Sequence, residues 1–183
     1  MDKPWYRKLF GRPPESAVET PEVNADHEDA EVQFGLGLRF ANDKSSRQDY
    51  AQAAHWYRKA ADQSHALAQF NLGVMYARGQ GVDRDDVTAK MWLGKAAQQG
   101  DAGAQYHLGM RHHRASMDGQ PDNAVESRVE AFKWLHLAAA QGYKGSVAAC
   151  EFVTLGMTLQ EVTDGRHRTA AFVAVSSNRP EAH

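Results

Sequence analysis

The chain has 183 residues, of which 21 are Lys or Arg and 23 are Asp or Glu, so its formal net charge at pH 7 is −2. This balance excludes nucleic acid and anionic lipid as partners attracted by bulk charge. The single cysteine, Cys150, excludes an intrachain disulfide, and no apolar run approaches the roughly 20 residues that span a bilayer. We expect a cytoplasmic, monomeric protein built as one compact domain or a short repeat array.

Residues 1–27 are predicted to be a flexible segment that precedes the folded part of the chain. Within it, residues 1–12 would form a short amphipathic helix with aromatic side chains on one side and basic ones on the other. Three interpretations stay open for this stretch: a disordered tail, a segment docked on its own domain, and a peptide that contacts a membrane or a partner.

Three segments then repeat the same residues at a constant period. Gln33-Phe34-Gly35-Leu36-Gly37 returns in related form at positions 69–73 and 105–109, a step of 36 residues each time. A tryptophan and an alanine pair follow each copy, the tryptophans being Trp56, Trp92 and Trp134. A constant period indicates one supersecondary unit copied in tandem.

Each unit is predicted to be a pair of helices. In the second copy, the i, i+1, i+4 spacing of Leu72, Gly73 and Tyr76 places them on one helical face, where the glycine lets another helix approach closely. Asp85 suits the start of the second helix, and Gly100 suits its end.

These residues resemble the Sel-one-like repeat, a relative of the tetratricopeptide repeat. The shared pattern is A-x-x-x-x-L-G-x-x-Y-x-x-G-x-G-V-x-x-D, then A-x-x-W-x-x-x-A-A-x-x-G, and residues 66–100 follow it almost position for position. The resemblance covers roughly residues 28–174. It implies a non-catalytic scaffold that binds proteins or peptides.

The third copy and the C-terminal part depart from the pattern. Gly109 to Trp134 spans 25 residues instead of 19, so we expect six extra residues in a surface loop within 116–123. A fourth, degraded unit has Cys150 at the leucine position and Glu151 at the glycine position, and Thr158 and Glu161 form a capping box before a last helix.

The predicted fold is therefore all-α, a right-handed α-solenoid of about eight helices. Its repeats are expected at about 30–65, 66–101 and 102–143, followed by a degenerate capping helix pair at 144–174 and a polar tail at 175–183.

Candidate chemistry is sparse. The loop at 79–82 has the glycines of a phosphate loop, but no strand precedes it, so a turn between helices is the better interpretation. His107, His112 and His113 contain no pair at the i, i+4 spacing of helical metal ligands. We expect no catalytic residue, no cofactor and no metal, and a hydrolase unrecognisable from sequence is the alternative.

A second stripe on the first helix of each unit is the candidate binding surface. If these helices line the concave side, as in tetratricopeptide arrays, the stripe can hold a peptide with a carboxylate facing Arg78 and Arg114. Its residues are Phe34, Leu38, Asn42, Phe70, Val74, Arg78, Tyr106, Met110, His113 and Arg114. Alternatively, the aromatic residues only pack between repeats. An immunity or host-directed protein would use the same surface.

Overall fold

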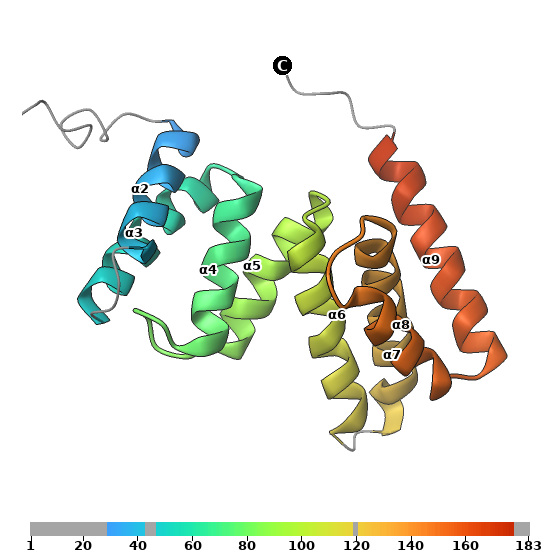
Figure 1. Cartoon of the computed structure of the whole chain (residues 1–183). Helices are drawn as coiled ribbons and strands as arrows, with labels where there is room; N and C mark the ends of the chain where they lie inside the picture. The colour runs from blue at the N-terminus through green and yellow to red at the C-terminus, as the bar shows by residue number, and fades with distance from the viewer. Residues whose placement is uncertain (1–28, 43–46, 119–120, 178–183) are drawn as a thin grey trace, which may run out of the picture.

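The computed structural model describes residues 29–42, 47–118 and 121–177, and these ranges form eight helices and no strand (Figure 1). The predicted amphipathic stretch in residues 1–12 lies outside them. The helices are α2 (Ala30–Asn42), α3 (Arg47–Asp62), α4 (Ala66–Arg78), α5 (Asp86–Gln98), α6 (Ala102–Met117), α7 (Pro121–Ala140), α8 (Ser146–Leu155) and α9 (Leu159–Ser177).

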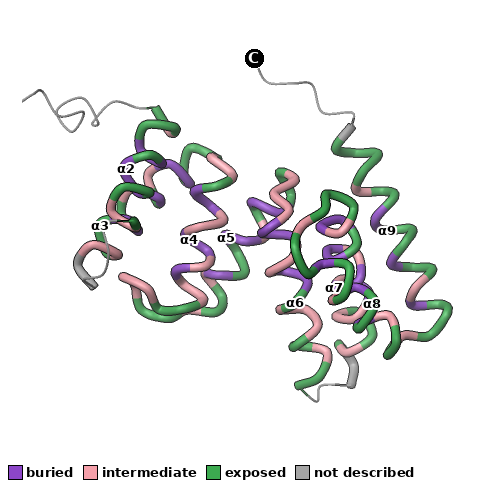
Figure 2. The backbone as a smooth tube through the Cα atoms, viewed as in Figure 1, coloured by how far each residue is buried: buried purple, intermediate pink, exposed green. Residues whose placement is uncertain are grey.

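The helices follow one another as stacked pairs. α2 packs on α3, α4 on α5 and α6 on α7, and successive pairs meet where α3 contacts α4 and α5 contacts α6. Figure 2 shows the buried backbone where the helices face one another, with exposed residues on the outer sides. The predicted all-α solenoid is confirmed.

Three glycines let the two helices of a pair approach closely, as the sequence pattern predicts. A Cβ atom added to Gly73 would lie 2.8 Å from Cγ of Leu93, and one added to Gly109 would lie 2.7 Å from Cγ of Leu135. At Gly37 the added atom would collide with the ring of Tyr57. A side chain at these positions would force the paired helices apart.

A ladder of glutamine amides connects the repeats. Gln69 is 2% exposed, and its Nε2 donates to the carbonyl of Ala61 in the preceding pair, at 3.0 Å. Its Oε1 accepts from Nε2 of Gln99 at 2.8 Å. Gln105 repeats both bonds, donating to Ala97 and accepting from Gln141. Because a buried amide is costly unless bonded, the ladder fixes the register of each pair on its neighbour.

The loop between α4 and α5 is a structural turn, as predicted. Gly79 ends α4 with φ 68°, and Gly81 also has a positive φ, 67°. A Cβ atom on Gly81 would strike the backbone at Tyr50, so the loop lies directly against α3. Asp85 caps α5 by accepting from the backbone amides of Val87 and Thr88.

The prediction of a surface loop within 116–123 is wrong. Ser116 and Met117 belong to α6, and α7 begins at Pro121, so the two helices are lengthened to 16 and 20 residues while their connection is short. Helix continuation satisfies backbone hydrogen bonds that a loop would leave to water. The extra residues therefore extend the third pair at its far end.

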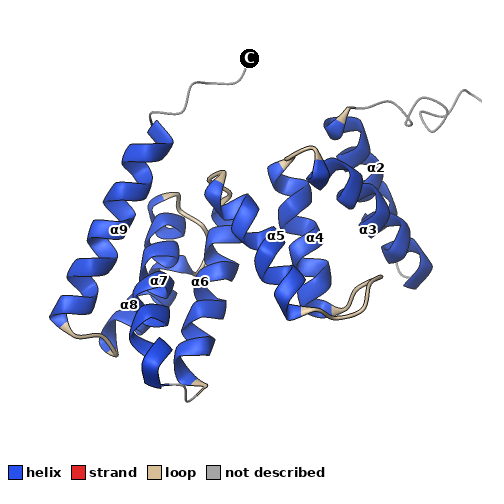
Figure 3. Ribbon diagram, turned by 180° about the vertical axis from the view of Figure 1, so that it is seen from behind, coloured by secondary structure: helices blue, strands red, loops and turns tan. Residues whose placement is uncertain are grey.

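The C-terminal helices close the array (Figure 3). Cys150 is buried, and Thr158 and Glu161 form the predicted capping box, with Thr158 N donating to the Glu161 carboxylate. α9 packs chiefly on α7, where Gly165 allows close contact with Phe132, and not as a close partner of α8. With Glu151 in place of the usual glycine, α8 lacks the surface on which the other pairs close.

Candidate functional site

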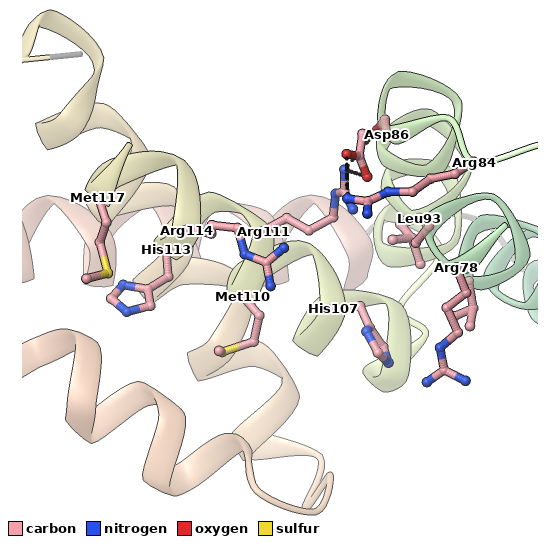
Figure 4. A pocket seen from close by; sticks show the side chains of 12 residues that line it. Arg78, Arg84, Asp86, Leu93, His107, Met110, Arg111, His113, Arg114 and Met117 are labelled. Atoms are coloured by element: carbon pink, nitrogen blue, oxygen red, sulfur yellow. Dashed lines mark hydrogen bonds and ion pairs between the residues drawn. The ribbon is translucent and has the colours of Figure 1, made fainter. Parts of the chain in front are cut away.

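A cavity of about 370 Å³ opens between α4, the turn after it, the start of α5, and α6 (Figure 4). We call it the arginine pocket because four of its lining residues are arginines. It is lined by Val74, Ala77, Arg78, Arg84, Asp86, Leu93, His107, Met110, Arg111, His113, Arg114 and Met117. Five of the ten predicted stripe residues are among them: Val74, Arg78, Met110, His113 and Arg114.

Asp86 is the only acidic residue of this lining, and two arginines already neutralise it. Its carboxylate lies 3.0 Å from Nη2 of Arg111 and 3.1 Å from Nη2 of Arg84, and Figure 4 shows both side chains directed at it. Hydrogen bonds from Arg111 and Arg84 lower the pKa of Asp86. Arg111 also donates to the Asp86 backbone carbonyl at 2.9 Å, which fixes α6 to the start of α5.

Arg78 and Arg114 are the unpaired cations of the pocket. Within the described part of the chain neither guanidinium makes a hydrogen bond or an ion pair, and both are exposed. Four arginines against one aspartate leave the pocket strongly positive, although the whole chain carries −2. A guanidinium binds a carboxylate with two parallel hydrogen bonds, so these two side chains suit an acidic group.

The positive charges of the pocket also affect the pKa of His107. Burial lowers its pKa from the ordinary 6.5, and the nearby charges of Arg78 and Arg111 lower it further. The imidazole is therefore neutral at pH 7, and a neutral ring does not add to the positive charge of the pocket.

Apart from His113, apolar side chains form the rest of the lining. Val74 and Met110 occupy equivalent places on α4 and α6, and Met110 is 36% and Met117 70% exposed. Methionine is flexible and adapts to ligands of different shape. The pocket thus offers cations beside apolar contacts.

The remaining stripe residues lie elsewhere. Phe34 is 7% exposed and stacks on His65 at 4.5 Å between ring centroids, so it packs between repeats and offers no binding surface, which corrects the prediction. Phe70 contacts Gly103 and His107, and Tyr106 lies against Tyr143, so these rings are also partly used in packing. Leu38 and Asn42 are exposed on α2, outside the pocket.

Sequence reasoning missed Arg84, Asp86 and Arg111 as pocket residues. Arg111 stands in the histidine and arginine cluster of α6, but only the packing of α5 on α6 brings it to Asp86. Arg84 precedes the helix cap Asp85 in the α4–α5 turn, a place with no periodic signal. No group of three or more His, Cys, Asp or Glu among the described residues is arranged to hold a metal ion.

This architecture is typical of a family of repeat proteins. The Sel1 repeat family model matches residues 30–65, 66–101 and 102–143, which together make up more than half of the chain, so the protein belongs to the Sel1 repeat family. Such repeats suggest a protein-interaction scaffold. No curated protein matches the chain.

Several solved structures are similar to it, among them the following two. The first is c5321, a protective antigen of uropathogenic Escherichia coli strains with an SLR fold, which matches with a TM-score of 0.69 and 25% identity over 87% of this chain. This chain spans only 35% of that protein's length. The second is a Sel1 repeat protein from Oxalobacter formigenes, with a TM-score of 0.58 and 34% identity over 71% of this chain and 93% of its own. Among the residues that the structure describes, no helix has the length and apolarity to cross a membrane.

Proposed function

We propose that the protein is a non-catalytic interaction module whose arginine pocket binds an acidic peptide segment of a partner protein. The observation that carries the proposal is that the guanidiniums of Arg78 and Arg114, which have no ion pair or hydrogen bond among the described residues, line the same pocket from two different repeats. Membership of the Sel1 repeat family supports the general role in protein binding.

The chemistry favours a carboxylate as the recognised group. Asp86 already shows how this pocket holds one, between Arg84 and Arg111. A partner carboxylate, from an acidic side chain or a chain terminus, would take the same kind of charge-assisted bonds from Arg78 and Arg114. The apolar residues Val74 and Met110 beside them would cover the partner's neighbouring side chain. A cytoplasmic location and a monomeric state stay predictions.

A charge-reversal experiment tests the proposal. Proteins captured from the native lysate by the wild type would be compared with those captured by Arg78→Glu with Arg114→Glu, and affinity for each identified partner would be measured by calorimetry. We expect the double variant to lose at least about tenfold in affinity, because it replaces attraction by repulsion.

The matched control reverses two exposed cations outside the pocket, Lys144 and Arg166, to glutamate. It changes the net charge equally and should keep the affinity. Equal affinity of both variants, each with wild-type helicity by circular dichroism, would place the binding surface elsewhere.

A further inference from the structure

The row of apolar residues in the arginine pocket continues onto α8. Because Cys150 stands at the position of Leu108, Phe152 two residues later is the counterpart of Met110. The ring of Phe152 meets His113 edge to face, with centroids 5.6 Å apart and planes at 88°. His113 lines the arginine pocket, so Phe152 is directly continuous with it.

This end of the row is open to solvent. Phe152 is 62% exposed, Leu155 is 87% exposed, and Met117, at the pocket edge beside His113, is 70% exposed. Leu155 follows Phe152 by three residues and so lies next to it on the helix surface. We call Met117 of α6 together with Phe152 and Leu155 of α8 the α8 platform. Among the described helices none covers it, because α9 packs chiefly on α7.

Charge changes along the same row. α4 and α6 carry Arg78 and Arg114 at equivalent positions, whereas α8 has Gly156 at that position. The basic residues therefore end before α8, while the apolar residues continue onto it. Glu151, the residue before Phe152, is also exposed. The surface therefore has a direction, from cations at α4 and α6 to apolar side chains at α8.

We propose that the α8 platform is the second half of the binding site and takes an apolar or aromatic side chain of the same peptide whose carboxylate lies at Arg78 and Arg114. This inference rests on the proposed function and adds the partner's chemistry: acidic residues next to an apolar anchor. Helices in contact lie about 8–10 Å apart, and an extended chain advances about 3.3 Å per residue, so the two anchors are separated by roughly three residues.

Synthetic peptides with blocked ends test this order directly. The probe has a pair of glutamates, a Gly-Ser spacer and a Leu-Phe pair, and a second version has the Leu-Phe pair replaced by Ser-Ser. A third version replaces the glutamates by glutamines. Binding to the full-length protein is measured by fluorescence anisotropy. We expect the Ser-Ser peptide to bind about tenfold more weakly than the probe.

A fourth peptide has the apolar pair before the glutamates and establishes the chain direction. A fifth has a free C-terminus in place of the acidic side chains and establishes the source of the carboxylate. The inference predicts tighter binding whenever carboxylate and apolar anchor occur together, whichever source supplies the charge.

Variants of the protein test whether the higher affinity of the probe over the Ser-Ser peptide depends on the α8 platform. Phe152→Ser should lower affinity for the probe about tenfold and leave affinity for the Ser-Ser peptide unchanged, whereas Phe152→Leu should restore most of the loss. The control is Val175→Ser, at a side chain 65% exposed on α9, which should change neither affinity.

Equal affinity of the probe and the Ser-Ser peptide, or a Phe152→Ser variant that binds the probe like the wild type, would overturn the inference. The proposed function would survive both results as long as the glutamine peptide binds weakly and the arginine reversals abolish binding. A wild type that binds none of the acidic peptides would overturn both.

Discussion

The three repeated tryptophans differ in burial, because only the second and third pack against the pair of helices before their own. Trp92 is 4% exposed and packs among residues of the first pair, and Trp134 is 5% exposed and packs against α5. Trp56 is only half-buried, since no described helix precedes its own pair, and Lys59 lies over its ring. The later two tryptophans are therefore core residues, and the first is not fully buried.

The indole nitrogens give a paired prediction. Nε1 of Trp92 is buried with no hydrogen-bond partner, whereas Nε1 of Trp134 donates to Glu130 at 3.0 Å. Trp92→Ala should cost about 3–5 kcal/mol of unfolding free energy. Trp92→Phe should cost less than Trp134→Phe, because only the second removes a bond and leaves a partly buried carboxylate short of a donor. Urea titration of the four proteins measures this, and the reverse order of the two phenylalanine variants would contradict it.

His107 predicts the pH dependence of peptide binding. Its pKa is lowered in the free protein, mainly by burial and then by Arg78 and Arg111. A carboxylate bound in the pocket would raise that pKa again, so binding takes up protons. Affinity for an acidic peptide should therefore increase as the pH falls from about 7.5 towards 6, and His107→Gln should remove most of the change. A wild type and variant with the same profile would show that the carboxylate lies away from His107.

At the scale of secondary-structure elements, ion pairs connect α9 to α7. Arg168 on α9 bonds to Glu126 and Glu130 of α7, and Arg128 of α7 bonds to Glu161 of α9. Hydrophobic contact adds to this, since Phe172 lies edge to face on Trp134 with centroids 5.4 Å apart. The helix is thus held by ion pairs together with apolar contacts to α7.

These ion pairs predict how stability depends on acid. Burial raises the pKa of Glu130, but bonds from Arg168 and Lys133 outweigh it, so the pKa is below the ordinary 4.5; the bond from Arg168 likewise lowers that of Glu126. A depressed carboxylate pKa stabilises the fold above about pH 4.5, and this stabilisation is lost as the pH falls through the lowered value. Arg168→Met should lower the Tm at pH 7 and reduce the further loss of Tm as the pH falls from about 5 to about 3, while Arg166→Met should behave as wild type. Parallel Tm curves for all three proteins would contradict this role.

The elements themselves were largely predictable, since local signals determine them. The glycines at 73 and 109, the Asp85 cap and the Thr158 capping box are all recognisable from nearest neighbours along the chain. The positions of the six extra residues and of α9 were not predictable from the sequence. Both depend on tertiary packing, which local sequence signals do not determine. The arginine pocket was half predictable: helix periodicity placed Arg78 and Arg114, but the ion pairs of Asp86 need the packing of two repeats.

On the scale of the whole molecule, each pair of helices contacts mainly its neighbours, and the three hydrophobic clusters extend across pair boundaries. An array of this kind unfolds cooperatively when the interfaces between units are strong relative to the units themselves. We expect one urea transition, with coincident curves from tryptophan fluorescence and from helicity. Separate transitions, or a Trp92→Ala variant in which only half of the helicity melts early, would show independent halves.

The glutamine ladder also limits how such a chain can grow by duplication. A copy of residues 66–101 inserted after Asp101 would carry its own Gln69 and Gln99 counterparts. Its Gln69 counterpart would donate to the Ala97 carbonyl, and Gln105 would donate to the copy's own counterpart of Ala97, so both joints would be satisfied. The same copy added after α8 would not, because Val147 occupies the glutamine position there and α9 already covers α7. We therefore expect the interior of the array to accept new repeats, each of which would lengthen the protein without disturbing its C-terminal end.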